Sequence, residues 1–215
     1  MITEPAVTLT DYALSLECAL FTYLIHQHGD RSNSLRAWFI LFFGSIGLAA
    51  LVGGTVHGFF LSTDTMGSAI LWPAALIATG ITALSAWAIG ARMLFPAPIS
   101  RWISLAAAVE FMTYSIVVLI VTQEFWIAIV NYVPAVLFLL VSFCGAYGRT
   151  HDMRLLTGSV GFLLTLIASW IQQRGLALHP VYFDHNALFH LIQAGALFLI
   201  FWSARWLVRA SSERS

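Results

Sequence analysis

The chain has 215 residues, of which 60% are hydrophobic and only 9% are charged, and its formal net charge is zero. A soluble domain of this composition would expose too much apolar surface, so we predict an integral membrane protein. The balanced charge gives no indication of a nucleic-acid partner. All ten basic residues are arginine, and the absence of lysine excludes a retinal Schiff base, which requires a lysine amine.

Seven apolar runs, each close to the length of about 20 residues that crosses a bilayer, follow one another along the chain. The breaks between them are rich in Gly, Pro, Ser, Asp and Arg, which is typical of loops. We therefore predict an all-α, polytopic membrane protein with a single seven-helix transmembrane domain over residues 1–215. The predicted helices cover approximately 8–28, 35–61, 67–93, 101–122, 125–147, 154–173 and 186–209.

The arginines predict the orientation of this domain, because cytoplasmic loops are enriched in basic residues. Nine of the ten lie in or beside the loops after the first, third and fifth helices or at the end of the seventh, and only Arg174 lies on the other side. We therefore expect the N-terminus outside and the C-terminus in the cytoplasm.

The first predicted helix, 8–28, carries two carboxylates. Asp11 lies three or four residues inside the helix, where it either caps the helix start or contributes to a site. Glu17 lies about 9 Å deeper at the helical rise per residue. A carboxylate at such a depth is costly unless it is neutral, paired or in a wet cavity, so Glu17 belongs either to a proton path or to a buried structural pair.

The second predicted helix, 35–61, contains His57 within "LVGGTVHG". His57 lies about four residues before the helix exit, roughly 6 Å below the outer surface. The glycines around it, Gly53, Gly54 and Gly58, would let a neighbouring helix approach closely. The loop that follows contains Asp64, a second candidate for a catalytic carboxylate beside Asp11.

Two further polar residues lie within the fourth and fifth predicted helices. Glu110 is near the middle of 101–122, and Asn131 is about two turns into 125–147. We interpret them, together with Glu17, as a supporting polar layer deeper in the membrane, serving either as a proton path or as structural pairs.

The seventh predicted helix opens with "FDHNALFHLIQ", an unusually polar start for a membrane segment. Asn186, His190 and Gln193 are spaced i, i+4, i+7 and share one face, which is not expected of a surface that contacts lipid. They belong either to a site or to hydrogen bonds between helices. Asp184 has the residue type and position of an N-cap for this helix.

His190 lies about four residues past the entry of its helix, at a depth similar to that of His57 and Asp11. His185 lies just above this layer. Two histidines and a carboxylate at one depth suggest metal ligation or general acid–base chemistry, and the alternative is two histidines hydrogen-bonded across a helix interface.

Seven helices, the motif "GGTVHG" near the outer end of the second and "DHNALFH" at the start of the seventh resemble the CREST superfamily of membrane hydrolases. This superfamily includes the alkaline ceramidases and the adiponectin-receptor-like proteins, and the resemblance is greatest to a bacterial branch. It implies a zinc ion held by three histidines, with an aspartate and a serine nearby, and a zinc-bound water that attacks a lipid amide. It also implies location in the bacterial inner membrane.

In this resemblance His57 matches the ligand of the second helix, and His190 matches the second histidine of the pair in the seventh. The first histidine of that pair is replaced by Asn186, so His185 or Asp11 would have to complete the ligand set. The position of the family's serine is occupied by Gly53, and the aspartate has no match other than Asp11 or Asp64.

Three functions follow from these observations. The first is a zinc-dependent hydrolase of a lipid amide or ester near the outer leaflet, with membrane lipids as partners. The second is a non-catalytic member of the same scaffold: a lipid- or ligand-binding protein, a receptor or an assembly subunit. The third is a haem protein with His57 and His190 as axial ligands.

Overall fold

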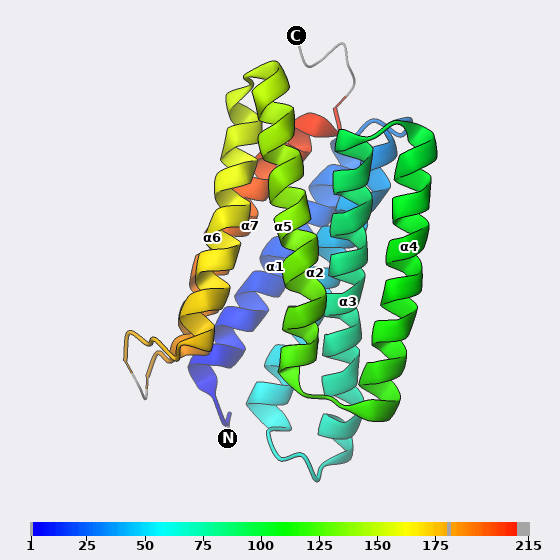
Figure 1. Ribbon diagram of the computed structural model, residues 1–215. Helices are drawn as coiled ribbons and strands as arrows, with labels where there is room; N and C mark the ends of the chain where they lie inside the picture. Colours follow the sequence, from blue (N-terminus) through cyan, green and yellow to red (C-terminus); the bar gives the residue numbers. More distant parts are fainter. Residues whose placement is uncertain (1, 180–181, 210–215) are drawn as a thin grey trace.

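A computed structural model describes residues 2–179 and 182–209, and all its regular elements are helices (Figure 1). Their order and number in the described chain agree with the prediction, and α7 ends at the opposite end of the bundle from the start of α1. The helices are α1 Pro5–His28, α2 Ser34–Phe59, α3 Met66–Leu94, α4 Ala97–Ile116, α5 Phe125–Thr150, α6 Met153–Gln173 and α7 His185–Leu207, and α4 continues into a π-helical turn, η1, at Val117–Val121.

Six of these helices are long and apolar enough to cross a membrane, namely α2, α3, α4 with η1, α5, α6 and α7. This result supports an integral membrane protein. The first helix, α1, is not among the six, and it carries Asp11 and Glu17 along its 24 residues. The polar residues of α1 therefore distinguish it from the rest of the bundle.

Six helices form a closed ring in which each packs against two neighbours, in the order α1, α2, α3, α5, α6, α7 and back to α1. The remaining helix, α4, packs chiefly against α3 and lies outside this ring (Figure 1). Only 17% of the apolar stretch of Ala97–Val121 is buried, compared with 39–50% in the five other candidate spans. The ring therefore encloses the interior, and α4 is peripheral to it.

Several helix boundaries extend beyond the predicted ones. The fourth helix begins at Ala97 rather than near residue 101, because Pro98 fits the first turn, where no intrahelical N–H bond is lost. The fifth continues to Thr150 and ends where His151 adopts a left-handed conformation with φ 52°. At the start of α7, the Asp184 side chain accepts a hydrogen bond from Ala187 N at 2.9 Å, which confirms the predicted N-cap.

The half of the bundle away from the start of α1 has a densely packed aromatic core, which we term the packed half. Phe21 and Phe201 stack with ring centroids 4.2 Å apart, and Phe42 meets Phe43 edge-to-face at 5.3 Å. These side chains are nearly or fully buried. Aromatic packing of this kind contributes strongly to stability through area burial and ring contacts.

Glycines on α2 bring α1 into close contact, as the sequence predicts. A Cβ atom on Gly54 would lie 2.7 Å from Cβ of Asp11, and one on Gly58 would lie 3.0 Å from the Thr8 side chain. The missing side chains thus position the carboxylate of Asp11 directly against the second helix.

Candidate ligand-binding site

A cavity of about 380 Å³ occupies the half of the ring nearer the start of α1, which we term the hollow half. Side chains from all six ring helices line it, and none of the described lining residues comes from α4. Its volume lies within the range of about 300–1,000 Å³ that is typical of small-molecule sites. All six ring helices therefore contribute to this site, and α4 takes no part in its described lining.

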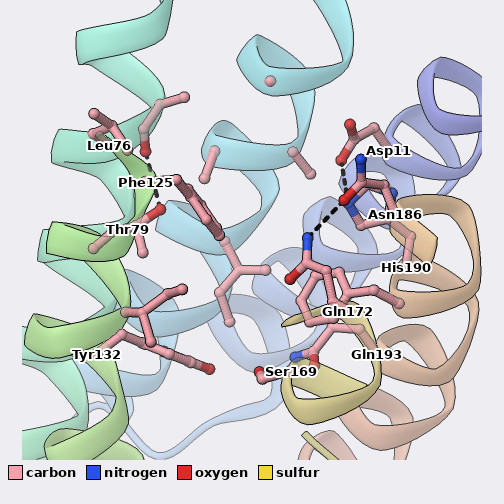
Figure 2. Close-up of a pocket in the computed structure, with 18 of the residues that line it drawn as sticks. Asp11, Leu76, Thr79, Phe125, Tyr132, Ser169, Gln172, Asn186, His190 and Gln193 are labelled. Carbon is pink, nitrogen blue, oxygen red and sulfur yellow. Dashed lines mark hydrogen bonds and ion pairs between the residues drawn. The ribbon is translucent and has the colours of Figure 1, made fainter. Parts of the chain in front are cut away.

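The two sides of the cavity differ in chemistry (Figure 2). Side chains of α3 and α5 form a mostly apolar side: Trp72, Ala75, Leu76, Phe125, Ala128, Ile129 and Val133, with Thr79, Thr82 and Tyr132 among them. Side chains of α1, α6 and α7 form a polar side: Asp11, Ser169, Gln172, Asn186, His190 and Gln193. His57 and Gly53 of α2 lie in the same lining. The cavity is therefore amphipathic.

His190 uses both of its ring nitrogens within the protein. Its Nε2 lies 3.2 Å from Asp11 Oδ1, and its Nδ1 lies 3.1 Å from Thr10 Oγ1. The Thr10 hydroxyl also lies 2.9 Å from Ala6 O, and its hydrogen bond with Nδ1 holds the imidazole in place whichever of the two atoms donates. The carboxylate of Asp11 therefore faces an imidazole whose other nitrogen is held by Thr10.

Thr10, His190 and Asp11 have the connectivity of a hydroxyl–imidazole–carboxylate triad. Thr10 does not line the cavity, however, and its hydroxyl is bonded to its own helix backbone. Thr10 is therefore a residue that positions His190, not a nucleophile.

His57 is paired with the carboxylate of Glu4, which no sequence motif indicated as part of the site. Its Nδ1 lies 2.6 Å from Glu4 Oε2, and the two side chains are 24% and 33% exposed. The segment that carries Glu4 is fastened to the end of α2 by a hydrogen bond from Thr3 N to Gly58 O of 3.0 Å. Glu4 immediately precedes α1 and is seven residues from Asp11, and this spacing of two carboxylates at the helix start is the signal that could have revealed Glu4.

Two amides on α6 and α7 bond to each other across the helix interface. Gln172 Nε2 donates to Asn186 Oδ1 at 2.9 Å (Figure 2). About two turns deeper on α7, Gln193 is only 5% exposed, and its Oε1 is buried without a hydrogen-bond partner in the described chain. Asn186, His190 and Gln193 all line the cavity, as expected of residues that share one helix face.

Other candidate residues lie elsewhere. Asp64 is exposed in the loop between α2 and α3, and His185 is the first residue of α7 and does not line the cavity. Glu17 does not line the cavity, and its Oε2 is buried without a hydrogen-bond partner in the described chain. The supporting polar layer is therefore not a single cluster.

Glu110 and Asn131 form a separate pair between α4 and α5. With its amide nitrogen on the side of the carboxylate, Asn131 donates to both oxygens of Glu110. Neither residue lines the cavity. This arrangement fits the structural alternative for the pair, because it satisfies two polar groups where α4 meets the ring.

The zinc set expected from the resemblance, His57, His190 and His185, does not converge in this arrangement. Both ring nitrogens of His190 are bonded to protein groups, and His185 lies outside the cavity lining. Within residues 2–179 and 182–209, no three His, Cys, Asp or Glu side chains are grouped so that they could hold a metal ion. An axial haem ligand binds iron through a free ring nitrogen, and both ring nitrogens of His190 are bonded to other residues.

These features define a helical membrane protein whose ring of six helices encloses an amphipathic cavity. The chain belongs to a family described as a family of unknown function, DUF6962, which matches residues 6–208. No curated protein and no solved structure matches this chain. The family match extends from the first turn of α1 to just beyond α7, so it includes nearly all of the ring and the whole cavity lining.

Proposed function

We propose that this protein binds an amphiphilic small molecule inside the membrane. The observation that carries the proposal is the cavity within the ring, with one apolar side and one polar side. A hydrocarbon tail would pack against Leu76, Phe125 and Ala128, and a polar head would lie against Gln172 and Gln193. Apolar pockets with a few convergent polar groups are the usual form of small-molecule sites.

We further propose that α1 is a seventh membrane span and that the N-terminus lies outside. With 24 residues, α1 is about 36 Å long at the helical rise, enough to cross a bilayer core of about 30 Å. It also closes the ring between α2 and α7, and the nine-to-one distribution of arginines favours this orientation. The cavity would then open within the outer half of the membrane, where lipids of the outer leaflet could enter.

The experiment is to purify the protein in a mild detergent and identify bound amphiphiles by native mass spectrometry. Gly53→Leu is the test variant, because Gly53 lines the cavity and its nearest group is Asp11 Oδ2, 3.9 Å from an added Cβ. Gly195→Leu is the matched control, because an added Cβ there meets nothing within 4 Å. We expect a bound amphiphile in the wild type and the control and its loss in Gly53→Leu. Equal occupancy in all three would contradict the proposal.

A second candidate, hydrolysis of the bound amphiphile, is favoured by the Glu4–His57 pair. The carboxylate orients Nδ1 of an imidazole that lines the cavity, and the structure gives Nε2 of His57 no hydrogen-bond partner among the residues it describes. A histidine in this arrangement can act as a general base. Hydrolysis of lipid amides or esters that is lost in His57→Gln but retained in Gly195→Leu would support it, and elemental analysis for zinc of the same samples tests the metal-dependent form.

A further inference from the structure

Three side-chain oxygens on the polar side of the cavity have acceptor capacity that the hydrogen bonds described above do not use. Gln193 Oε1 is the clearest case, since the side chain is 5% exposed and this buried oxygen has no partner in the described chain. A buried acceptor without a partner is destabilising, and because Gln193 lines the cavity, a ligand there can supply the missing donor.

Two neighbouring side chains add further acceptor oxygens. The amide nitrogen of Gln172 is turned toward Asn186, which leaves the Gln172 carbonyl oxygen on the cavity side (Figure 2). Asp11 bonds His190 through Oδ1, and Oδ2 remains near Gly53 in the cavity lining. The three oxygens come from α1, α6 and α7, so they surround the polar end of the cavity.

Among the described lining residues, only two histidines could carry a positive charge at this end of the cavity. The chain contains no lysine, and no arginine is among the residues that the structure places in the lining. Each imidazole in the lining faces a carboxylate that balances any positive charge on it, His190 facing Asp11 at 3.2 Å and His57 facing Glu4 at 2.6 Å. A phosphate, sulfate or carboxylate head would therefore lie against oxygen lone pairs in an apolar surrounding without a counter-charge, which is strongly unfavourable.

We propose that the ligand has an uncharged head group that carries hydrogen-bond donors, such as a hydroxyl or an amide N–H, and that Gln193 accepts one of these bonds. This inference rests on the proposed binding function and specifies the class of ligand. It excludes phospholipids and ionised fatty acids as ligands of this cavity.

The test compares four probes with the same chain and different heads: 12-bromododecan-1-ol, 12-bromododecanamide, methyl 12-bromododecanoate and 12-bromododecyl sulfate. The bromine quenches nearby tryptophan, and Trp72 lines the apolar side of the cavity. Quenching of tryptophan fluorescence is measured in lipid nanodiscs. The part that comes from the cavity is the quenching of the wild type minus the quenching of Trp72→Phe. We expect the alcohol and the amide to bind about tenfold more tightly than the ester, which lacks a donor, and than the sulfate.

Two variants at one position isolate the contact. Gln193→Met removes the acceptor at similar volume, and Gln193→Glu keeps an acceptor oxygen. We expect the Gln193→Met variant to bind the alcohol no more tightly than the ester. We expect the Gln193→Glu variant to retain the preference for the alcohol. Because the Gln193 oxygen has no partner in the part of the chain that the structure describes, Gln193→Met should unfold at the wild-type temperature or above, which a structural role would not allow.

The outcomes separate the two proposals. Binding of the sulfate or the ester as tightly as the alcohol, with quenching that depends on Trp72, would overturn the inference about the head group but keep the binding function. No Trp72-dependent quenching by any of the four probes would overturn both.

Discussion

The two halves of the ring are built from the same six helices but have opposite interiors. In the packed half, phenylalanines from α1, α2, α5, α6 and α7 fill the centre, with Phe143 and Phe162 only 5.1 Å apart between ring centroids. In the hollow half, small residues such as Ala49 and Gly53 leave a cavity, and polar side chains face it. The comparison indicates that the packed half provides stability and holds the helices in place, so that the hollow half can remain open for a ligand.

The largest expected difference between the halves concerns aromatic truncation. Phe43→Ala should lower the free energy of unfolding by about 4 kcal/mol, because it creates a void in a fully buried cluster. Phe189→Ala, in the cavity lining, should cost no more than about 2 kcal/mol, because it extends an existing space. Steric-trap unfolding in detergent micelles measures both, and equal costs would show that the halves are energetically alike.

Within the hollow half, the buried Asp11–His190 pair should be the most sensitive polar contact. Its side chains are only 6% and 11% exposed, so Asp11→Ala should cost about 3 kcal/mol by leaving the imidazole without its partner. The double variant Asp11→Ala/His190→Leu should recover much of this loss, because no unpaired group then remains buried. A double variant as unstable as the single one would mean that the pair has no specific energetic role.

The contact of α1 with α2 should tolerate an added methyl group at Gly53 but not at the neighbouring Gly54. Gly54→Ala should cost about 1–3 kcal/mol, because the new Cβ lies 2.7 Å from Cβ of Asp11. Gly53→Ala places its Cβ 3.9 Å from the nearest group, so its unfolding should remain close to that of the wild type. Thermal unfolding of the two variants side by side tests this, and a reversed order would contradict the described helix contact.

The smallest effect is expected at the outer pair. Glu4 and His57 are 33% and 24% exposed, so Glu4→Gln should change the free energy of unfolding by less than about 1 kcal/mol. The same variant should weaken any hydrolytic activity, because Gln cannot stabilise a protonated His57 in the way a carboxylate does. Chemical denaturation and a turnover assay on one preparation separate the two effects, and unchanged turnover would remove Glu4 from the second candidate function.

The sequence by itself determined the class of protein and much of the site. Long apolar runs have few alternatives to membrane helices, which is why the helix order was predictable. Helical periodicity placed Asn186, His190 and Gln193 on one face, and the structure finds all three in the cavity lining. Similar depth in the membrane also grouped His57 with His190, because depth follows from position along a helix.

Only the tertiary structure decided which helices are neighbours. The stretch Ala97–Val121 has a mean hydropathy of 2.0, within the 1.6–2.3 of the other candidate spans, so nothing local indicates that α4 lies outside the ring. The partners of the two histidines were likewise hidden, since Glu4 lies in the first residues of the chain and Thr10 is 180 residues from His190. Periodicity determines the face on which a side chain lies, but its partner depends on how distant helices pack together.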